Sequence, residues 1–179
     1  MDGFVHSCLL RNGFGYVWYN QGQGLNIESF KEEFKERLFM EFIQEWRSNV
    51  DESPKCVFYK EIKHDFILEP FIYRLPIYLA LYLIKFRTCN HKLEIEVGRY
   101  VNTERSERKC KMCNINSIGD EYHLIFECSN EKIVKLRKKY IPSKLLKNAN
   151  MSRFVNLFSL FNKNVYIRLC KFLKFTDVF

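Results

Sequence analysis

The spacing of hydrophobic residues along the chain predicts a mainly α-helical protein. Between residues 30 and 46, large apolar side chains recur every fourth position and charged residues occupy the positions between them. This period places the apolar side chains along one side of an α-helix. Ser29, with Glu32 three residues later, forms a capping-box pattern at the start. We therefore expect a surface helix that has one buried face and ends near Arg47.

Several later segments show the same helical period. Residues 75–87 are apolar on nearly all sides, as in a central core helix, and Pro76 suits the first turn because a proline there loses no hydrogen bond. Helices are also predicted over residues 130–140, over 151–161 with Asn150 as the cap, and from 164 to about 175. Residues 55–63 fit a short helix, and residues 93–100 fit a short strand or an extended link.

Breaks in this pattern divide the chain into four parts. The first 24 residues contain five glycines, which indicates an irregular lead-in over residues 1–27. A helical region over 28–100 follows, then a polar segment over 101–141, then a C-terminal helical pair over 142–179. The polar segment contains three cysteines and a histidine, the residue types that bind zinc, so the expected fold is a helical body with a small zinc-binding segment before its last helices.

One cluster of residues carries recognisable chemistry. Cys110, Cys113, His123 and Cys128 have the spacing C-x2-C-x9-H-x4-C. Three thiolates and one imidazole are a complete tetrahedral ligand set for Zn²⁺, and a site in which protein fills every position is structural. We expect one structural zinc ion, without which the polar loop over residues 102–119 is disordered, because that loop has little apolar surface to bury.

The spacing of the last two ligands constrains the local backbone. Residues five apart on a regular helix lie roughly 140° out of phase, so His123 and Cys128 cannot both face one ion from such a helix. We therefore expect a helical turn that begins near Asp120 and is distorted or ends before Cys128. Of the remaining thiols, Cys8, Cys56 and Cys170 lie in apolar contexts and are predicted to be small buried hydrophobes, while Cys89 and His91 form a pair that could supply alternative ligands.

Composition narrows the classes of function. The chain has 179 residues, 47% of them hydrophobic, which is enough to form a sizeable core. The first residues show no cationic start followed by a long apolar stretch, and the longest apolar run is too short to span a bilayer. These features favour an intracellular protein, cytoplasmic or nuclear, without a membrane partner. In those compartments cysteine thiols stay reduced and bind metal more often than they form disulfides.

Positive charge is concentrated around the cysteine cluster. The formal net charge is +8, and residues 99–147 contain twelve Lys and Arg against six Asp and Glu. Such a surface suits the phosphates of RNA or DNA, although a solvated helix face is the simpler alternative. The candidate nucleic-acid-binding residues are Arg99, Arg105, Arg108, Lys109, Lys111, Lys132, Lys135 and Lys139.

The chain also resembles a known family. Residues 93–100 (Leu-Glu-Ile-Glu-Val-Gly-Arg-Tyr), 107–110 (Glu-Arg-Lys-Cys) and 120–124 (Asp-Glu-Tyr-His-Leu), with Cys128, are similar to the C-terminal tail of reverse-transcriptase polyproteins. These polyproteins come from retrotransposons without long terminal repeats in invertebrates and fish. Residues 17–21 and 30–46 resemble the linker that precedes the tail. The resemblance implies a Cys-Cys-His-Cys zinc element that contacts nucleic acid during reverse transcription, with Cys110, Cys113, His123 and Cys128 as its ligands.

Catalysis is not expected. The chain has no Asp-Asp pair such as a polymerase palm domain uses for Mg²⁺, and four protein ligands leave a zinc ion no open position for hydrolysis. The sequence therefore predicts a zinc-stabilised nucleic-acid-binding module of retrotransposon origin. The alternatives are a zinc-shaped module that binds a protein partner, supported by the surplus of aromatic residues, and a non-functional remnant of a retroelement. The choice between RNA and DNA and the oligomeric state stay open.

Overall fold

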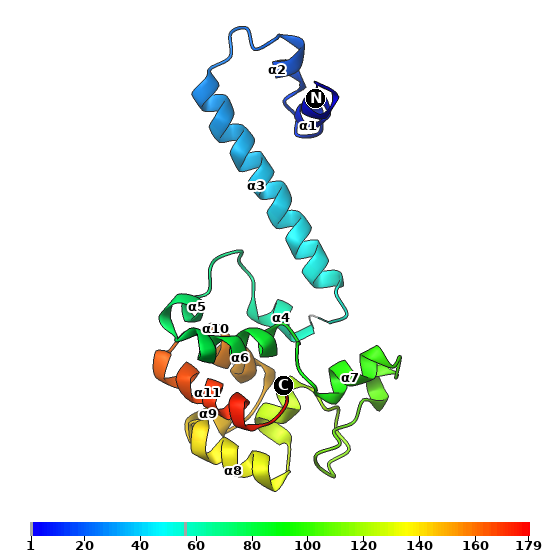
Figure 1. The fold of residues 1–179 in the computed structure, drawn as a ribbon, viewed down its shortest axis with the longest axis vertical. Helices are drawn as coiled ribbons and strands as arrows, with labels where there is room; N and C mark the ends of the chain where they lie inside the picture. The colour runs from blue at the N-terminus through cyan, green and yellow to red at the C-terminus, as the bar shows by residue number, and fades with distance from the viewer. Residues whose placement is uncertain (1, 56) are drawn as a thin grey trace. The chain divides into compact units, whose positions relative to one another are not determined.

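The protein is mainly α-helical, as predicted. A computed structural model describes residues 2–55 and 57–179, and it divides into two compact units, Met1–Glu52 and Ser53–Phe179 (Figure 1). The β-type pairing in the described residues is an isolated antiparallel bridge between Lys109 and Ile118. No helix among the described residues is both long enough and apolar enough to cross a membrane.

The first unit contains three helices: α1 (Asp2–Arg11), α2 (Gly15–Tyr19) and α3 (Ile27–Glu52). The expectation of an irregular lead-in over residues 1–27 is therefore wrong. Three of the glycines behind that expectation, Gly13, Gly22 and Gly24, have positive φ angles and lie in the turns between the helices. Glycine permits those turns because it has no Cβ, and the residues between the turns remain free to be helical.

Helix α3 differs from its prediction at both ends and in its burial. It begins before Ser29, whose backbone N–H donates to Asn26 Oδ1 at 3.1 Å, so the side chain of Asn26 serves as the cap. It continues to Glu52 and has no buried residue. Near its start, Phe30 and Phe34 pack edge-on against Phe14, with ring centroids 5.5 and 5.2 Å apart. Farther along, the apolar stripe is exposed, as at Leu38, Phe39 and Phe42.

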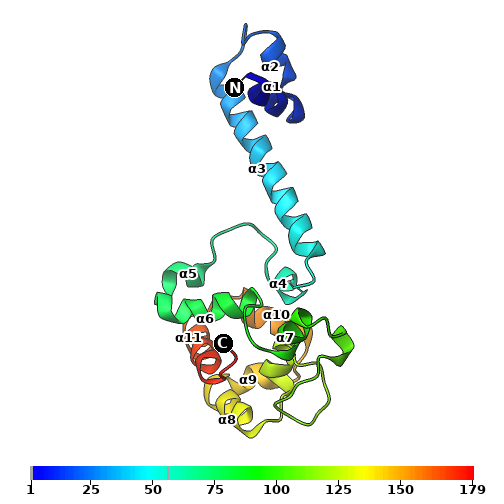
Figure 2. The same cartoon turned by 45° about the vertical axis from the view of Figure 1, so that its right-hand side comes forward.

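The second unit is built from short helices. In chain order they are α4 (Val57–Ile62), α5 (Pro70–Arg74), α6 (Ile77–Arg87), α7 (Glu94–Tyr100), the 3-10 turn η1 (Arg105–Glu107), the π-helical turn η2 (His123–Glu127), α8 (Glu131–Tyr140), α9 (Ser143–Leu146), α10 (Met151–Ser159) and α11 (Lys163–Phe175) (Figure 2). The boundary between the units after Glu52 falls inside the helical region predicted over 28–100, so that region is not a single body.

Helix α11 lies at the centre of this unit. It contacts α5, α6 and α8, and its residues Tyr166, Leu169 and Phe172 are almost fully buried. Helix α6 supplies Leu83 and Phe86 to the same core, which agrees with its predicted central position. One side of α6 is nevertheless exposed, because Ile77 and Tyr78 each keep 62% of their surface in contact with solvent.

Asparagine side chains cap three of these helices. Asn130 begins α8, Asn150 begins α10 and Asn162 begins α11, and each side-chain oxygen accepts backbone N–H groups of the first turn. The prediction of Asn150 as a cap is confirmed. The helices predicted over 130–140, 151–161 and 164–175 are likewise present, with ends shifted by one or two residues.

The segment over residues 93–100 is helical rather than extended. Gly98 disfavours a helix in isolation, but here it makes room for Arg108: a Cβ at Gly98 would lie 2.5 Å from Arg108 Cγ. The Arg108 guanidinium donates to Ile95 O and Thr103 O, both at 2.9 Å. A contact from outside the helix therefore overrides the local preference of the sequence.

Candidate metal centre

The structure brings the four predicted ligands together. Cys110 and Cys113 lie on a hairpin-like turn in which the Cys110 N–H donates to Ser117 O and the Gly119 N–H donates to Arg108 O, each at 2.9 Å. The two arms approach so closely that a Cβ at Gly119 would lie 3.0 Å from Cys110 Cα. The Sγ atoms of Cys110, Cys113 and Cys128 and a ring nitrogen of His123 all lie within 4.8 Å of one another.

A distorted helical turn supplies the other two ligands, as the spacing predicted. Asp120 begins this turn, because its Oδ1 accepts the His123 N–H at 2.8 Å. The backbone then widens into the π-helical turn η2, where the Cys128 N–H donates to His123 O at 2.8 Å. A π turn closes a hydrogen bond between residues five apart, so it brings both ligands back to the same side of the backbone.

The separation of the donor atoms fits a metal ion. In a tetrahedral zinc site with Zn–S bonds of about 2.3 Å, neighbouring ligand atoms lie about 3.5–3.8 Å apart. The 4.8 Å limit on every pair of donors is compatible with such a site, and Cys113 Sγ lies 3.2 Å from His123 Nε2. Cys110, His123 and Cys128 are buried and Cys113 is half-buried, so the protein largely encloses the cluster. These residues could therefore hold a metal ion.

The ring of His123 is oriented for coordination. Its Nδ1 lies 3.2 Å from Glu127 Oε2 while its Nε2 faces the sulfur of Cys113. A carboxylate beside Nδ1 favours the tautomer with hydrogen on that nitrogen, which leaves the Nε2 lone pair directed into the cluster. Glu127 thus orients the ligand without being one.

The three thiols differ in acidity. Burial raises the pKa of Cys128 to about 12, and burial also raises the pKa of Cys110. Burial acts in the same direction on Cys113, but the opposing causes, chiefly hydrogen bonds from the backbone N–H groups of Ile115 and Ser129, outweigh it and lower the pKa of this thiol to about 6. A metal that binds at neutral pH therefore meets a thiolate at Cys113 and displaces protons from the other two thiols.

Helix α8 supports the centre from behind. Asn130, at its start, donates through Nδ2 to Met112 O at 3.0 Å and so ties the first ligand turn to the helix. Arg137, two turns later, donates through one Nη to Leu124 O at 3.1 Å and to Cys128 O at 3.0 Å. These bonds fix both ligand-bearing segments against one rigid element.

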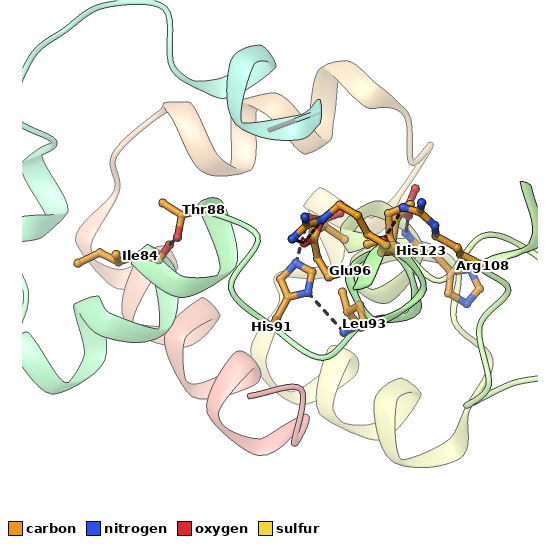
Figure 3. Close-up of polar contacts among 11 residues, drawn as sticks. Ile84, Thr88, His91, Leu93, Glu96, Arg108 and His123 are labelled. Carbon is orange, nitrogen blue, oxygen red and sulfur yellow. Dashed lines mark hydrogen bonds and ion pairs between the residues drawn. The ribbon is translucent and has the colours of Figure 1, made fainter. Parts of the chain in front are cut away.

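A second cluster of possible ligands lies nearby but is already satisfied as a buried hydrogen-bonded group. Donor atoms of Cys89, His91 and Glu121 also lie within 4.8 Å of one another. His91 Nδ1 accepts the Leu93 N–H at 3.4 Å (Figure 3), which places the ring hydrogen on Nε2, 3.0 Å from Glu121 Oε1. Cys89 and His91 thus group with Glu121 and not with the four donors of the first cluster.

Two other described cysteines, Cys8 and Cys170, belong to neither cluster, and Cys56 lies outside the described residues. Cys170 is fully buried in the core, as predicted, and burial raises the pKa of its thiol to about 12. Cys8 is only half-buried, so the prediction of a buried side chain is not met there. The same prediction for Cys56 falls outside the described residues.

The eight basic residues predicted to bind nucleic acid take different positions. Arg108 is half-buried and its guanidinium holds backbone carbonyls, so it has a structural contact that the sequence did not indicate. Arg99, Arg105 and Lys109 are likewise half-buried, and Arg99 pairs with Glu96. The four lysines Lys111, Lys132, Lys135 and Lys139 are exposed. Of these, Lys111 pairs with Glu94, Lys132 with Asp177 and Lys135 with Glu131, while Lys139 lies against the ring of Tyr140.

Sequence reasoning missed the residues that position the ligands. Glu127 follows His123 at the i,i+4 spacing, which is itself a signal for a side-chain contact. Arg137 shares one face of α8 with Ile133, so its inward direction could have been read from the helical period. The contact of Asn130 with Met112 joins residues eighteen apart through an irregular loop, and no local pattern indicates it.

Comparisons with known proteins add no assignment. No family model matches the chain, and neither a curated protein nor a solved structure matches it. The function must therefore be argued from the site itself.

The role of Glu127 can be tested by substitution. Glu127→Gln keeps the size of the side chain but removes the charge that holds the His123 tautomer, so we expect metal affinity to fall about 10- to 100-fold. Glu131→Gln, an exposed carboxylate on α8, is the matched control and should leave affinity unchanged. Competition with a chromophoric chelator measures both. Equal affinities for the two variants would contradict the orienting role.

Proposed function

We propose that this protein is a zinc-stabilised nucleic-acid-binding module without catalytic activity of its own. The observation that carries the proposal is the convergence of three thiols and one imidazole on a single buried point, directly before the lysine-rich helix α8. Soft sulfur ligands with one imidazole favour Zn²⁺ over Mg²⁺, Ca²⁺ or Mn²⁺. Four protein ligands fill a tetrahedral shell and leave no position for a substrate or a reactive water, which supports a structural ion.

The charges around the centre support a polyanionic partner. Lys132, Lys135 and Lys139 are exposed on α8, the helix that holds both ligand segments, and Lys111 lies between the first two ligands with 76% of its side chain exposed. The carboxylates paired with Lys132 and Lys135, those of Asp177 and Glu131, are exposed, so these ion pairs contribute little stability and exchange readily with phosphates. A metal that fixes α8 against the ligand turns would therefore hold these cations in one arrangement.

The resemblance to the C-terminal tail of retrotransposon reverse-transcriptase polyproteins supports the same function. The residues that carry the resemblance include three of the four ligands, Cys110, His123 and Cys128, and the Asp120 that caps the π turn. The proposed ligand is RNA or DNA bound through phosphates with little sequence preference, since lysine and arginine contacts to phosphate carry no base information.

A second candidate function, binding of a protein partner, has its own supporting observation in the first unit. Helix α3 exposes several large apolar side chains, among them Leu38, Phe39 and Met40 with 37%, 53% and 56% of their surface accessible. Exposed apolar residues of this size mark many protein-interaction surfaces. This candidate requires zinc as well but predicts no affinity for nucleic acid, so the experiments below separate the two.

Zinc binding is the first test. The purified, reduced protein should take up one equivalent of Zn²⁺ per chain, as measured by atomic emission after gel filtration. Cys110→Ser removes a buried sulfur ligand and should abolish stoichiometric binding, whereas Cys8→Ser, which changes a half-buried thiol in the first unit, should retain it. Full binding by Cys110→Ser, or no binding by the unaltered chain, would rule out a zinc centre at these residues.

Salt-dependent nucleic-acid binding is the second test. Substitution of Lys132, Lys135 and Lys139 by Gln removes three phosphate contacts, which should lower affinity and reduce the slope of log K against log salt by about 2 for a single-stranded ligand. The matched control replaces Lys31, Lys35 and Arg37 of α3, which removes the same charge from the first unit. Fluorescence anisotropy at several salt concentrations measures both. An affinity that does not change with salt concentration, or an equal loss of affinity in the control variant, would refute the proposed binding surface.

A further inference from the structure

Two aromatic rings form a stacked pair at the ends of α8 and α11. Tyr140 is the last residue of α8 and Phe175 is the last residue of α11, and the two helices pack against each other. The ring centroids lie 5.8 Å apart with an interplanar angle of 15°. Tyr140 is half-buried, whereas Phe175 keeps 44% of its surface accessible. Tyr140 also packs against the edge of the core, and the pair presents an aromatic surface to solvent chiefly through Phe175.

Cations surround this pair. Lys139 Nζ lies 5.2 Å from the centroid of Tyr140, and Lys174 Nζ lies 5.9 Å from the centroid of Phe175. Arg168 is exposed beside them and donates to Tyr140 O at 2.9 Å. The carboxylate closest in sequence to Phe175, that of Asp177, is paired with Lys132. The rings thus lie where the local potential is positive.

The geometry of the pair is fixed before any ligand arrives. The guanidinium of Arg168, from the middle of α11, bonds the carbonyls of both Lys139 and Tyr140 and so joins the end of α8 to α11. Phe172 and Leu173, just before Phe175, are fully buried and hold the end of α11 in the core. A rigid aromatic surface loses little conformational freedom when a ligand stacks on it.

We propose that Tyr140 and Phe175 form a stacking site for unpaired bases, so that the partner of this surface is a single-stranded nucleic acid. Aromatic rings flanked by lysine and arginine are the combination that binds single strands, because the rings stack on bases while the cations contact the backbone phosphates. A duplex offers the same phosphates, but its bases are stacked on one another and present only their edges. The inference rests on the proposed nucleic-acid function and adds the substrate class and the site.

The test compares a short labelled oligothymidylate with a duplex of the same length, using the zinc-loaded full chain and fluorescence anisotropy. The unaltered protein should bind the single strand more tightly than the duplex. Tyr140→Leu and Phe175→Leu keep an apolar side chain but remove the ring, and each should weaken single-strand binding about tenfold or more with little change for the duplex. Tyr78→Leu, an exposed tyrosine on α6, is the matched control and should bind as the unaltered protein does.

Charge and stacking can be separated in the same experiment. The leucine variants keep every cation, so their salt slope should equal that of the unaltered protein, whereas Lys139→Gln with Lys174→Gln should reduce the slope by about 1.4 for the single strand. Zinc content and the thermal unfolding midpoint of each variant show whether it is folded. If Tyr140→Leu is unfolded, the binding of Phe175→Leu tests the stacking site by itself. Phe175 is the more exposed ring, so its substitution is less disruptive to folding.

The possible outcomes keep the two proposals apart. If neither oligonucleotide binds at low salt, the nucleic-acid function itself fails and the stacking site fails with it. If both bind but the duplex is preferred, or if folded leucine variants bind the single strand as the unaltered protein does, the nucleic-acid function stands and the stacking site is refuted. Selective loss of single-strand binding in the leucine variants supports the site.

Discussion

The convergence of four donor atoms from two separate segments, the turn at Cys110 and Cys113 and the π turn from His123 to Cys128, is the constraint on which the second unit depends. The connection between them is polar and gives few side chains to the core. A structural zinc contributes roughly 10–16 kcal/mol to the folding of its segment, which is comparable to the whole stability of an ordinary domain. Apolar packing holds α6, α10 and α11 together, with hydrogen bonds from Arg87 and Tyr166 to Phe158 O. The ligand turns would instead depend on a bound metal ion and on the hydrogen bonds from α8.

Helix α8 connects this centre with the proposed function. On its inner side, Asn130 and Arg137 bond the carbonyls of the two ligand segments. On its outer side, Lys132, Lys135 and Lys139 reach solvent. A metal ion that fixes the ligand turns would therefore also fix the positions of these lysines. The hydrogen bonds of Arg168 to the carbonyls of Lys139 and Tyr140 hold the end of α8, with its aromatic pair, against α11. The proposed zinc ion would position the lysines through α8 and would not itself contact the nucleic acid.

The sequence predicted the structure correctly where residues close together in the chain determine it. The five-residue interval between His123 and Cys128 required a distorted turn near Asp120, and the π turn is the distortion observed. Asn150 lies where a cap was expected. The prediction failed where contacts between residues far apart in the sequence determine the local structure. Residues 93–100 fitted a short strand or an extended link, but the side chain of Arg108 packs over Gly98 and stabilises α7. The apolar period of α3 indicated a buried face, yet a period shows only that residues share a side of a helix and not whether anything covers it.

X-ray absorption spectroscopy of the zinc-loaded protein tests the central claim most directly, because it reports the atoms bound to the metal and their distances. We expect a four-coordinate ion with three sulfur atoms at about 2.3 Å and one nitrogen at about 2.0–2.1 Å, and we expect one sulfur to be lost in Cys128→Ser. A first shell made mainly of oxygen and nitrogen, or a sulfur count that does not change in that variant, would show that the ion is held elsewhere and would contradict the account.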